Sequence, residues 1–129
     1  MKKTIFMDKY PVYTLEISKN ETTFTNVDEI LAYYKAKVDE HEIATFISIF
    51  DHYSHTQKLE GEINPDIKDA KNIVFCFGAA IPNTKILAVR PRSIGVAELE
   101  KSFVVEFIEA PKEKLHNVME SWSKSLVTK

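Results

Sequence analysis

Hydrophobic and polar residues alternate along residues 10–18, and this period of two predicts a β-strand with one face exposed to water. Residues 43–50 and 73–77 are apolar at nearly every position, which is typical of strands buried in the middle of a sheet. Residues 103–108 are also mostly apolar and predict the last strand. In the first strand, the side chains expected to face the core are Tyr13, Leu15 and Ile17.

Two segments have apolar residues at helical spacing. Asn26 stands three residues before Glu29, a pair that can cap a helix, and the helix predicted from it continues to about Glu40. Pro111 predicts the start of a final helix. The apolar side of the first helix is formed by Val27, Ile30, Leu31, Tyr34 and Val38, and that of the last by Leu115, Val118, Met119, Trp122 and Leu126.

Together these elements predict a single α+β domain over residues 1–129. We expect a two-layer sandwich in which a four-stranded sheet carries the two long amphipathic helices on one face. A polar connection is expected over residues 53–72, and a short helix over residues 85–89. The pattern does not predict the order of the strands within the sheet.

Composition narrows the class of protein. The chain has 129 residues, 44% of them hydrophobic and 28% charged, which is enough apolar material for a core without disulfides. The net charge of −2 includes no basic block, so nucleic acid is not an expected partner. No segment is apolar for long enough to span a membrane, and the only cysteine, Cys76, is expected to be buried. We therefore expect a soluble cytoplasmic protein without a cofactor.

Polar residues and glycine gather where the two central strands are expected to end. Asp51 and His52 follow one apolar run, and Phe77 and Gly78 close the next. If the two runs are neighbouring strands, these groups could meet at one rim of the sheet and form a pocket. The predicted ligand-binding residues are Asp51, His52, Phe77, Gly78, Asn83, Thr84, Arg90 and Arg92.

The same segments carry a family resemblance. Between Ile43 and Ala110, a recognisable series of motifs is formed by Asp51-His52, Phe77-Gly78, Pro82, Thr84, Pro91 and Ile94-Gly95. In these positions the chain resembles the bacterial domain of unknown function three-hundred-and-two family. It departs from that family in residues 79–81, in Asn83 where the family has Gly, and after Gly95, where the family's Leu-Pro is missing. The resemblance implies a small α+β sandwich, often dimeric, and no particular reaction.

Each candidate residue has a structural alternative. Asp51 could orient His52 for acid-base chemistry, or it could accept backbone N–H groups where the strand ends. His52 and His55 could share a metal ion if they lie on a helix, although two histidines define such a site only weakly. Gly78 could open an anion-binding loop or simply permit a tight turn, which is the favoured interpretation.

The arginines and one further histidine have similar alternatives. Arg90 and Arg92 could clamp a small anionic ligand, or they could pair with Glu98 and Glu100, which is the more common situation for surface arginines. His116 lies between two apolar positions of the last helix and is expected to point to solvent.

Three functions are compatible with these observations. The leading hypothesis is a ligand-binding or regulatory domain, a homodimer with a pocket at the strand-end rim. The second is a small enzyme with Asp51 and His52 as its acid-base pair. The third is a protein-interaction module that acts as a dimer, through a dimer face or through an exposed strand edge.

Overall fold

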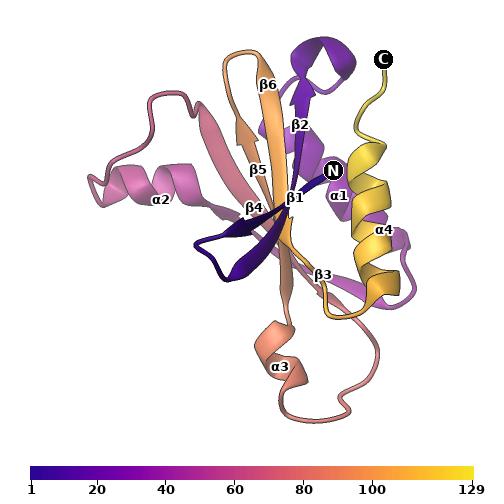
Figure 1. Cartoon of the computed structure of the whole chain (residues 1–129). Coiled ribbons are helices and arrows are strands. Elements are labelled where there is room, and N and C mark those ends of the chain that lie inside the picture. Colours follow the sequence, from indigo (N-terminus) through magenta and orange to yellow (C-terminus); the bar gives the residue numbers. More distant parts are fainter.

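The alternating segment predicted as the first strand lies inside a larger sheet. The computed structural model describes residues 1–129, and it contains six strands and four α-helices (Figure 1). The elements are β1 (Lys2–Phe6), β2 (Tyr10–Ser18), a 3-10 turn (Lys19–Glu21), α1 (Val27–Glu40), β3 (Ala44–Asp51), α2 (His52–Lys58), β4 (Asp69–Phe77), α3 (Ile86–Val89), β5 (Arg92–Glu98), β6 (Ser102–Ile108) and α4 (Glu113–Lys124).

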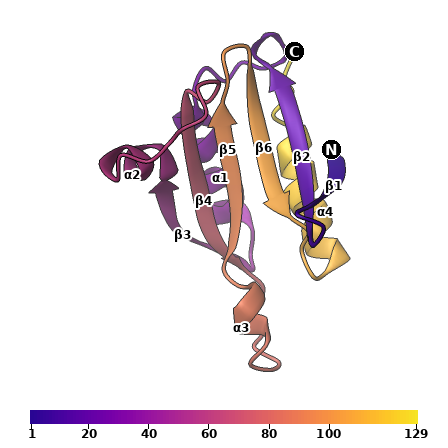
Figure 2. The same cartoon turned by 60° about the vertical axis from the view of Figure 1, so that its left-hand side comes forward.

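All six strands form one antiparallel sheet in the order β1-β2-β6-β5-β4-β3, which Figure 2 shows nearly side by side. The two longer helices, α1 and α4, lie on the same face of this sheet (Figure 2). The shorter helices do not cover a face: α2 extends from the end of β3, and α3 lies beyond the opposite end of the sheet (Figure 1). One face is therefore covered, and the other is largely open.

The core lies between the sheet and the two long helices. On the sheet, alternate residues of each central strand point inward, including Ile73, Phe75, Ile94 and Val105, which are fully buried. The ring of Trp122 on α4 stacks on Phe77 at 5.6 Å between centroids. The apolar side of α1 is buried at each of the positions that the sequence pattern predicted: Val27, Ile30, Leu31, Tyr34 and Val38.

A buried hydrogen bond connects the two long helices. The hydroxyl groups of Tyr34 and Ser123 lie 2.7 Å apart, and Ser123 Oγ is also 2.9 Å from the carbonyl oxygen of Met119. Because Tyr34 is completely buried, desolvation raises the pKa of its phenol above the ordinary value. Each buried hydroxyl thus has a partner, which is the usual condition for polar groups in a core.

The predicted four-stranded sheet is wrong, because β1 and β5 also belong to the sheet. Both hairpins that contain them turn without glycine or proline: β1 and β2 are joined through Met7 and Asp8, whose φ angles of 53° and 58° are ones that glycine or asparagine usually adopts. The turn between β5 and β6, residues 99–101, also lacks these residues. Both turns therefore lack the glycine-containing pairs, such as Asn-Gly or Asp-Gly, by which a hairpin is usually recognised in a sequence.

Three further expectations are corrected by the structure. The polar connection over residues 53–72 contains most of α2 and the first part of β4. His116 is buried, since its ring edge packs on Tyr13 at 4.2 Å and its Nδ1 accepts a hydrogen bond from the Ala110 N–H at 3.3 Å. Cys76 is only half-buried, because it points to the uncovered face between the core residues Phe75 and Phe77.

None of the four helices combines the length and the apolar character that a membrane span requires.

Candidate functional site

The sheet is interrupted between β5 and β6. Strand β5 pairs with β4 along its whole length, from Glu98 to Arg92, but with β6 only from Glu98 to Gly95. Residues 92–94 therefore have no ladder partner on β6, and the two strands diverge toward the end of the sheet that carries α3 (Figure 2). We call this interruption the split.

A cleft of about 650 Å³ lies at the split. One wall comes from the β1–β2 hairpin and from β6, with Phe6, Val12 and Ile108, and the opposite wall comes from the α3 segment, with Val89 and Pro91. Phe6 is 59% exposed and Ile108 is 47% exposed, so apolar surface faces this cleft without a covering element. The remaining lining residues are Thr4, Asn72, Ala88, Arg92, Ser93, Gly95, Glu106 and Phe107.

The floor of the cleft depends on Gly95. Along the sheet, Thr14, Glu106, Gly95 and Asn72 stand in one row, each opposite the next. A Cβ atom on Gly95 would lie 3.3 Å from Asn72 Oδ1 and 3.6 Å from the Glu106 carbonyl oxygen. Because glycine has no side chain here, the space between the Asn72 amide and the Glu106 side chain stays open.

Arg92 provides the positive charge of the cleft. Its Nη2 donates to the carbonyl oxygen of Ile108 across the split, and its Nε is buried without a hydrogen-bond partner. The side chain forms no ion pair with a carboxylate. Partial burial lowers the pKa of Arg92 from its ordinary value, yet a guanidinium stays protonated at neutral pH. The cleft therefore contains a partly desolvated cation with no counter-ion.

Glu106 provides the negative charge. One of its carboxylate oxygens accepts a hydrogen bond from Thr14 Oγ1 at 2.8 Å, and the group has no cationic partner. Glu106 and Ile108 point to the same face two positions apart on β6, a separation of roughly 7 Å. Arg92 leaves β5 on the same side as the buried Ile94, and its Nη2 reaches the backbone carbonyl of Ile108, so the guanidinium contacts β6 two positions from Glu106.

A much smaller cavity, of about 20 Å³, lies on the other side of Arg92. It is lined by Phe77, Arg90 and Leu115, among others, and it shares Arg92 and Val89 with the larger cleft. Arg90 lines this small cavity and does not line the larger cleft. The two neighbouring arginines thus have different surroundings, and Arg92 is the one that reaches the open cleft.

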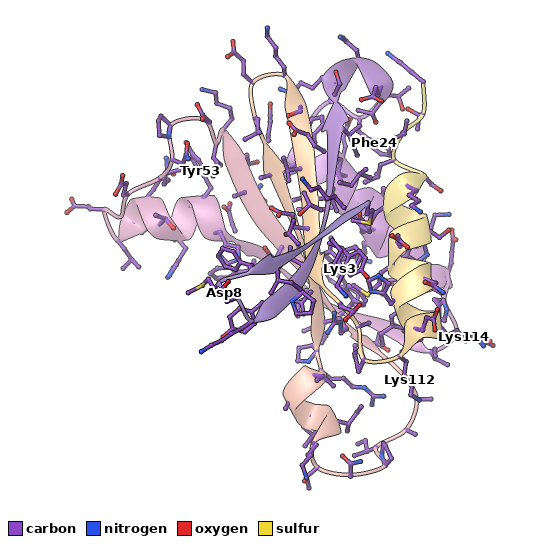
Figure 3. The ribbon with its side chains drawn as sticks, viewed as in Figure 1. Lys3, Asp8, Phe24, Tyr53, Lys112 and Lys114 are labelled. Carbon is purple, nitrogen blue, oxygen red and sulfur yellow. The ribbon has the colours of Figure 1, made fainter.

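The predicted strand-end rim does not form. Strands β3 and β4 are neighbours, as expected, but they are antiparallel, with Asp51 opposite Lys71 and Ala44 opposite Phe77. Asp51 and Gly78 therefore lie at opposite ends of the pair, roughly 20 Å apart along the strand. In Figure 3, Tyr53 marks the end near Asp51, and Lys112 marks the end where α3 and the split lie. The expectation of a common rim is wrong, whereas ligand binding by the individual residues stays a prediction.

At the first of these ends, Asp51 caps α2. Its carboxylate accepts hydrogen bonds from the Ser54 N–H at 2.9 Å and from Ser54 Oγ at 3.0 Å, and Lys71 Nζ lies 3.8 Å away. The backbone hydrogen bond from Ser54 is the main cause that lowers the pKa of Asp51. His52 makes no hydrogen bond to Asp51, and its ring packs edge-on against Phe50 at 4.5 Å. This is the structural alternative that the sequence offered for Asp51.

At the other end, the loop after β4 is held by its own contacts. Gly78 has a φ of +134°, a conformation that other residues rarely adopt, and its N–H donates to the Ile43 carbonyl at 3.0 Å. The guanidinium of Arg90 lies against Gly78 and donates to the Ala80 carbonyl at 2.6 Å. The geometry favours the tight-turn interpretation of Gly78, because Arg90 fills the space beside it.

The start of α3 is stabilised locally as well. Asn83 Oδ1 accepts from the Lys85 N–H at 3.0 Å, and the Thr84 carbonyl accepts from the Leu87 N–H at 3.1 Å. Neither Arg90 nor Arg92 pairs with Glu98 or Glu100, so the expected arginine–glutamate pairs are absent. Of the eight predicted residues, only Arg92 lines the cleft at the split; Phe77 and Arg90 line the small cavity behind it.

The sequence interpretation did not include the other polar residues of the cleft. Glu106 lies inside the apolar strand of residues 103–108, and a charged residue in such a strand indicates that one face of the strand is not buried. Gly95 inside a strand was a second signal, since a strand glycine often marks a place where something approaches the backbone closely. Neither signal predicts that the two residues face each other, because that depends on the register of β5 and β6.

The metal-site alternative receives no support from the geometry. His52 and His55 both lie on α2, but no group of three His, Cys, Asp or Glu side chains converges so that it could hold a metal ion.

Comparisons with known proteins place the chain in a family. A model of a family of unknown function, DUF6858, matches residues 1–128, and the chain belongs to this family. Among solved structures, the chain is similar to an uncharacterised conserved DUF302 protein from Bacillus stearothermophilus, with a TM-score of 0.59 and 11% sequence identity over 90% of this chain and 94% of that one. No curated protein matches it. The neighbour belongs to the family that the motifs resemble, and at this identity the likeness is one of fold.

Proposed function

We propose that this protein is a small-ligand-binding domain, and that its site is the cleft at the split on the uncovered face of the sheet. The observation that carries the proposal is Arg92, a partly buried cation that has an unpartnered Nε and no carboxylate beside it. Keeping such a charge away from water is unfavourable unless an anion compensates it. The ligand therefore carries an anionic group, which Arg92 binds.

The walls of the cleft determine the rest of the ligand. Phe6, Val12, Ile108 and Val89 present apolar surface around Arg92. Ligand sites commonly combine mostly apolar walls with a few polar groups that fix orientation, and their volumes run from about 300 to 1,000 Å³. We therefore expect a small carboxylate with a short apolar body. A planar carboxylate suits a guanidinium, because the two can form parallel hydrogen bonds.

Binding of hexanoate tests this function. We expect saturable NMR chemical-shift changes in the backbone amide signals of Gly95 and Ser93 when hexanoate is titrated into isotope-labelled protein. The Kd should lie in roughly the millimolar range for so small a molecule. Arg92→Met should weaken binding about tenfold, because the charge-assisted hydrogen bonds are lost. Arg92→Lys keeps the charge but loses the planar donor pair, and should have an intermediate effect.

Arg90→Met is the matched control, since Arg90 is two residues away and lines the small cavity but not the cleft. This variant should bind hexanoate as tightly as the unmodified protein. Hexanoate binding that persists unchanged in Arg92→Met, or shifts confined to residues near Asp51, would refute the assignment of the site. Thermal unfolding of each variant checks that it is folded.

The acid-base enzyme has no comparable observation in its favour. The Asp51 carboxylate is engaged by Ser54, and no contact joins it to His52. For this reason we carry forward only the binding function.

A further inference from the structure

Resting on this proposed function, we propose that the ligand is a zwitterion: a short apolar chain with a carboxylate at one end, bound by Arg92, and an ammonium group at the other end, bound by Glu106. The site thus accepts ligands of the amino-carboxylate class. Four features of the cleft lead to this inference.

The first feature is charge balance. The cleft contains one cation, Arg92, and one anion, Glu106, and neither forms an ion pair within the protein. A ligand that is only anionic would satisfy Arg92 but would be repelled by Glu106. At about 7 Å and with the dielectric constant of water, this repulsion corresponds to roughly a threefold loss of affinity, and it increases as water is excluded. An ammonium group on the ligand converts the repulsion into attraction.

The second feature is the free acceptor capacity of Glu106. A carboxylate has lone pairs for about four hydrogen bonds, and Thr14 Oγ1 uses only one of them at 2.8 Å. The Thr14 contact holds the side chain in place on the open face. An ammonium group, with three donors and no acceptor, fits the remaining lone pairs.

The third feature is the neighbourhood of Glu106 across the floor. The missing side chain of Gly95 leaves room between Glu106 and Asn72, whose amide makes no side-chain hydrogen bond of its own. The side-chain oxygen of Asn72, Oδ1, can thus accept a second hydrogen bond from the same ammonium group. A bulkier residue at position 95 would fill this space, because its Cβ would already touch Asn72 Oδ1 at 3.3 Å.

The fourth feature is the spacing. Arg92 donates to the Ile108 backbone carbonyl, and Glu106 is two positions away on β6, which is roughly 7 Å along the strand. The apolar side chains of Val12 and Ile108 line the same cleft as the two charged groups. A chain of about five methylene groups between carboxylate and ammonium covers this distance when it is extended.

Three probes separate the parts of the inference: hexanoate, hexylamine and 6-aminohexanoate. They have nearly the same length and differ only in which charged ends they carry. For the unmodified protein, 6-aminohexanoate should bind about fivefold more tightly than hexanoate, since it gains a solvent-accessible, hydrogen-bonded ion pair worth about 1 kcal/mol. Hexylamine should bind more weakly than either, because it leaves Arg92 without a counter-ion.

Glu106→Gln is the decisive variant. It keeps an acceptor for Thr14 and the size of the side chain, but it removes the charge. In this variant the preference for 6-aminohexanoate over hexanoate should fall to about one, and hexanoate should bind roughly threefold more tightly because the repulsion is gone. Glu100→Gln, in the exposed turn between β5 and β6, is the matched control and should preserve the fivefold preference.

The possible results distinguish the inference from the proposed function. If hexanoate binds in an Arg92-dependent way but 6-aminohexanoate binds no better, or if its advantage survives in Glu106→Gln, the zwitterion is refuted and the anion site stands. If neither probe shifts the signals of Gly95 and the Asn72 side-chain amide at roughly 10 mM, the binding function itself is refuted.

Discussion

Replacing Asp51 with alanine distinguishes the role that the sequence suggested for this residue from the role that its contacts indicate. The carboxylate accepts two hydrogen bonds from Ser54 at the start of α2, and removal of an N-cap of this kind costs about 1 kcal/mol. The contact with Lys71 at 3.8 Å adds little, because the Asp51 side chain is 38% exposed. We therefore expect a loss of about 1 kcal/mol in the free energy of unfolding, or roughly 4 °C in Tm.

The pH dependence has a defined sign. The pKa of Asp51 is lower in the folded protein than its ordinary value, first because of the Ser54 backbone N–H and to a smaller extent because of Lys71. The ionised carboxylate thus stabilises the fold above the pKa that it has in the unfolded chain, about 3.9, and this contribution is lost as the pH falls through the lower folded pKa. The stability difference between the unmodified protein and Asp51→Ala should therefore shrink as the pH is lowered from about 5 to about 2.

Urea unfolding measures the global effect, and hydrogen exchange of the α2 amides measures the local one. Asparagine caps helices about as well as aspartate, so Asp51→Asn should retain most of the stability at neutral pH. Hexanoate binding at the split should be unchanged in both variants. The capping role is refuted if Asp51→Ala alters neither the unfolding free energy nor the exchange of the Ser54 amide, and loss of ligand binding instead would restore the site predicted from the sequence.

Three other predictions follow from particular contacts. Ser123→Ala should cost about 1–3 kcal/mol, because it leaves the buried Tyr34 hydroxyl without a partner, whereas Tyr34→Phe should cost less; a double-mutant cycle by urea unfolding measures the coupling. Gly78→Ala should lower the free energy of unfolding by about 1–3 kcal/mol in the same assay, since φ is +134° and a Cβ would lie 2.2 Å from Arg90 Nη2. Adding Arg90→Met to this variant should remove the clash but not the backbone strain, so it should restore only part of the lost stability. The homodimer remains a prediction, and the free edge of β3 gives a test: if this edge pairs with a second copy, Ile47→Lys should convert a dimer to a monomer in light scattering.

The long helices could be predicted from the sequence because several local signals coincide in them. In α1, the capping residue Asn26 accepts from the Glu29 N–H at 2.8 Å, and the apolar period continues to Val38. Such signals depend on neighbours within one or two turns, so the rest of the fold is not needed to recognise them. The exception is His116, whose burial depends on the sheet residues Tyr13 and Phe107, which pack against it.

The sheet was less predictable, because its geometry depends on residues far apart in the sequence. The Met7–Asp8 turn adopts positive φ angles without glycine, which hides β1. The interpretation of Asp51 and Gly78 as neighbours failed for a related reason: both follow apolar strands, but their strands run in opposite directions. In an antiparallel pair, the groups that follow the two strands lie at opposite ends, whereas in a parallel pair they would share one edge.

The same distinction explains why the cleft lies where it does. In an antiparallel sheet with one face open, polar residues on alternate positions of β2 and β6 line the wet face, as Thr14 and Glu106 do. A continuous ladder would leave that face flat. Here the pairing of β5 with β6 stops at Gly95, the strands diverge, and Arg92 reaches across the split to the Ile108 carbonyl. A hollow lined by two opposite charges thus arises from the interruption of a regular ladder, and strand register is the property that would have to be known to predict it.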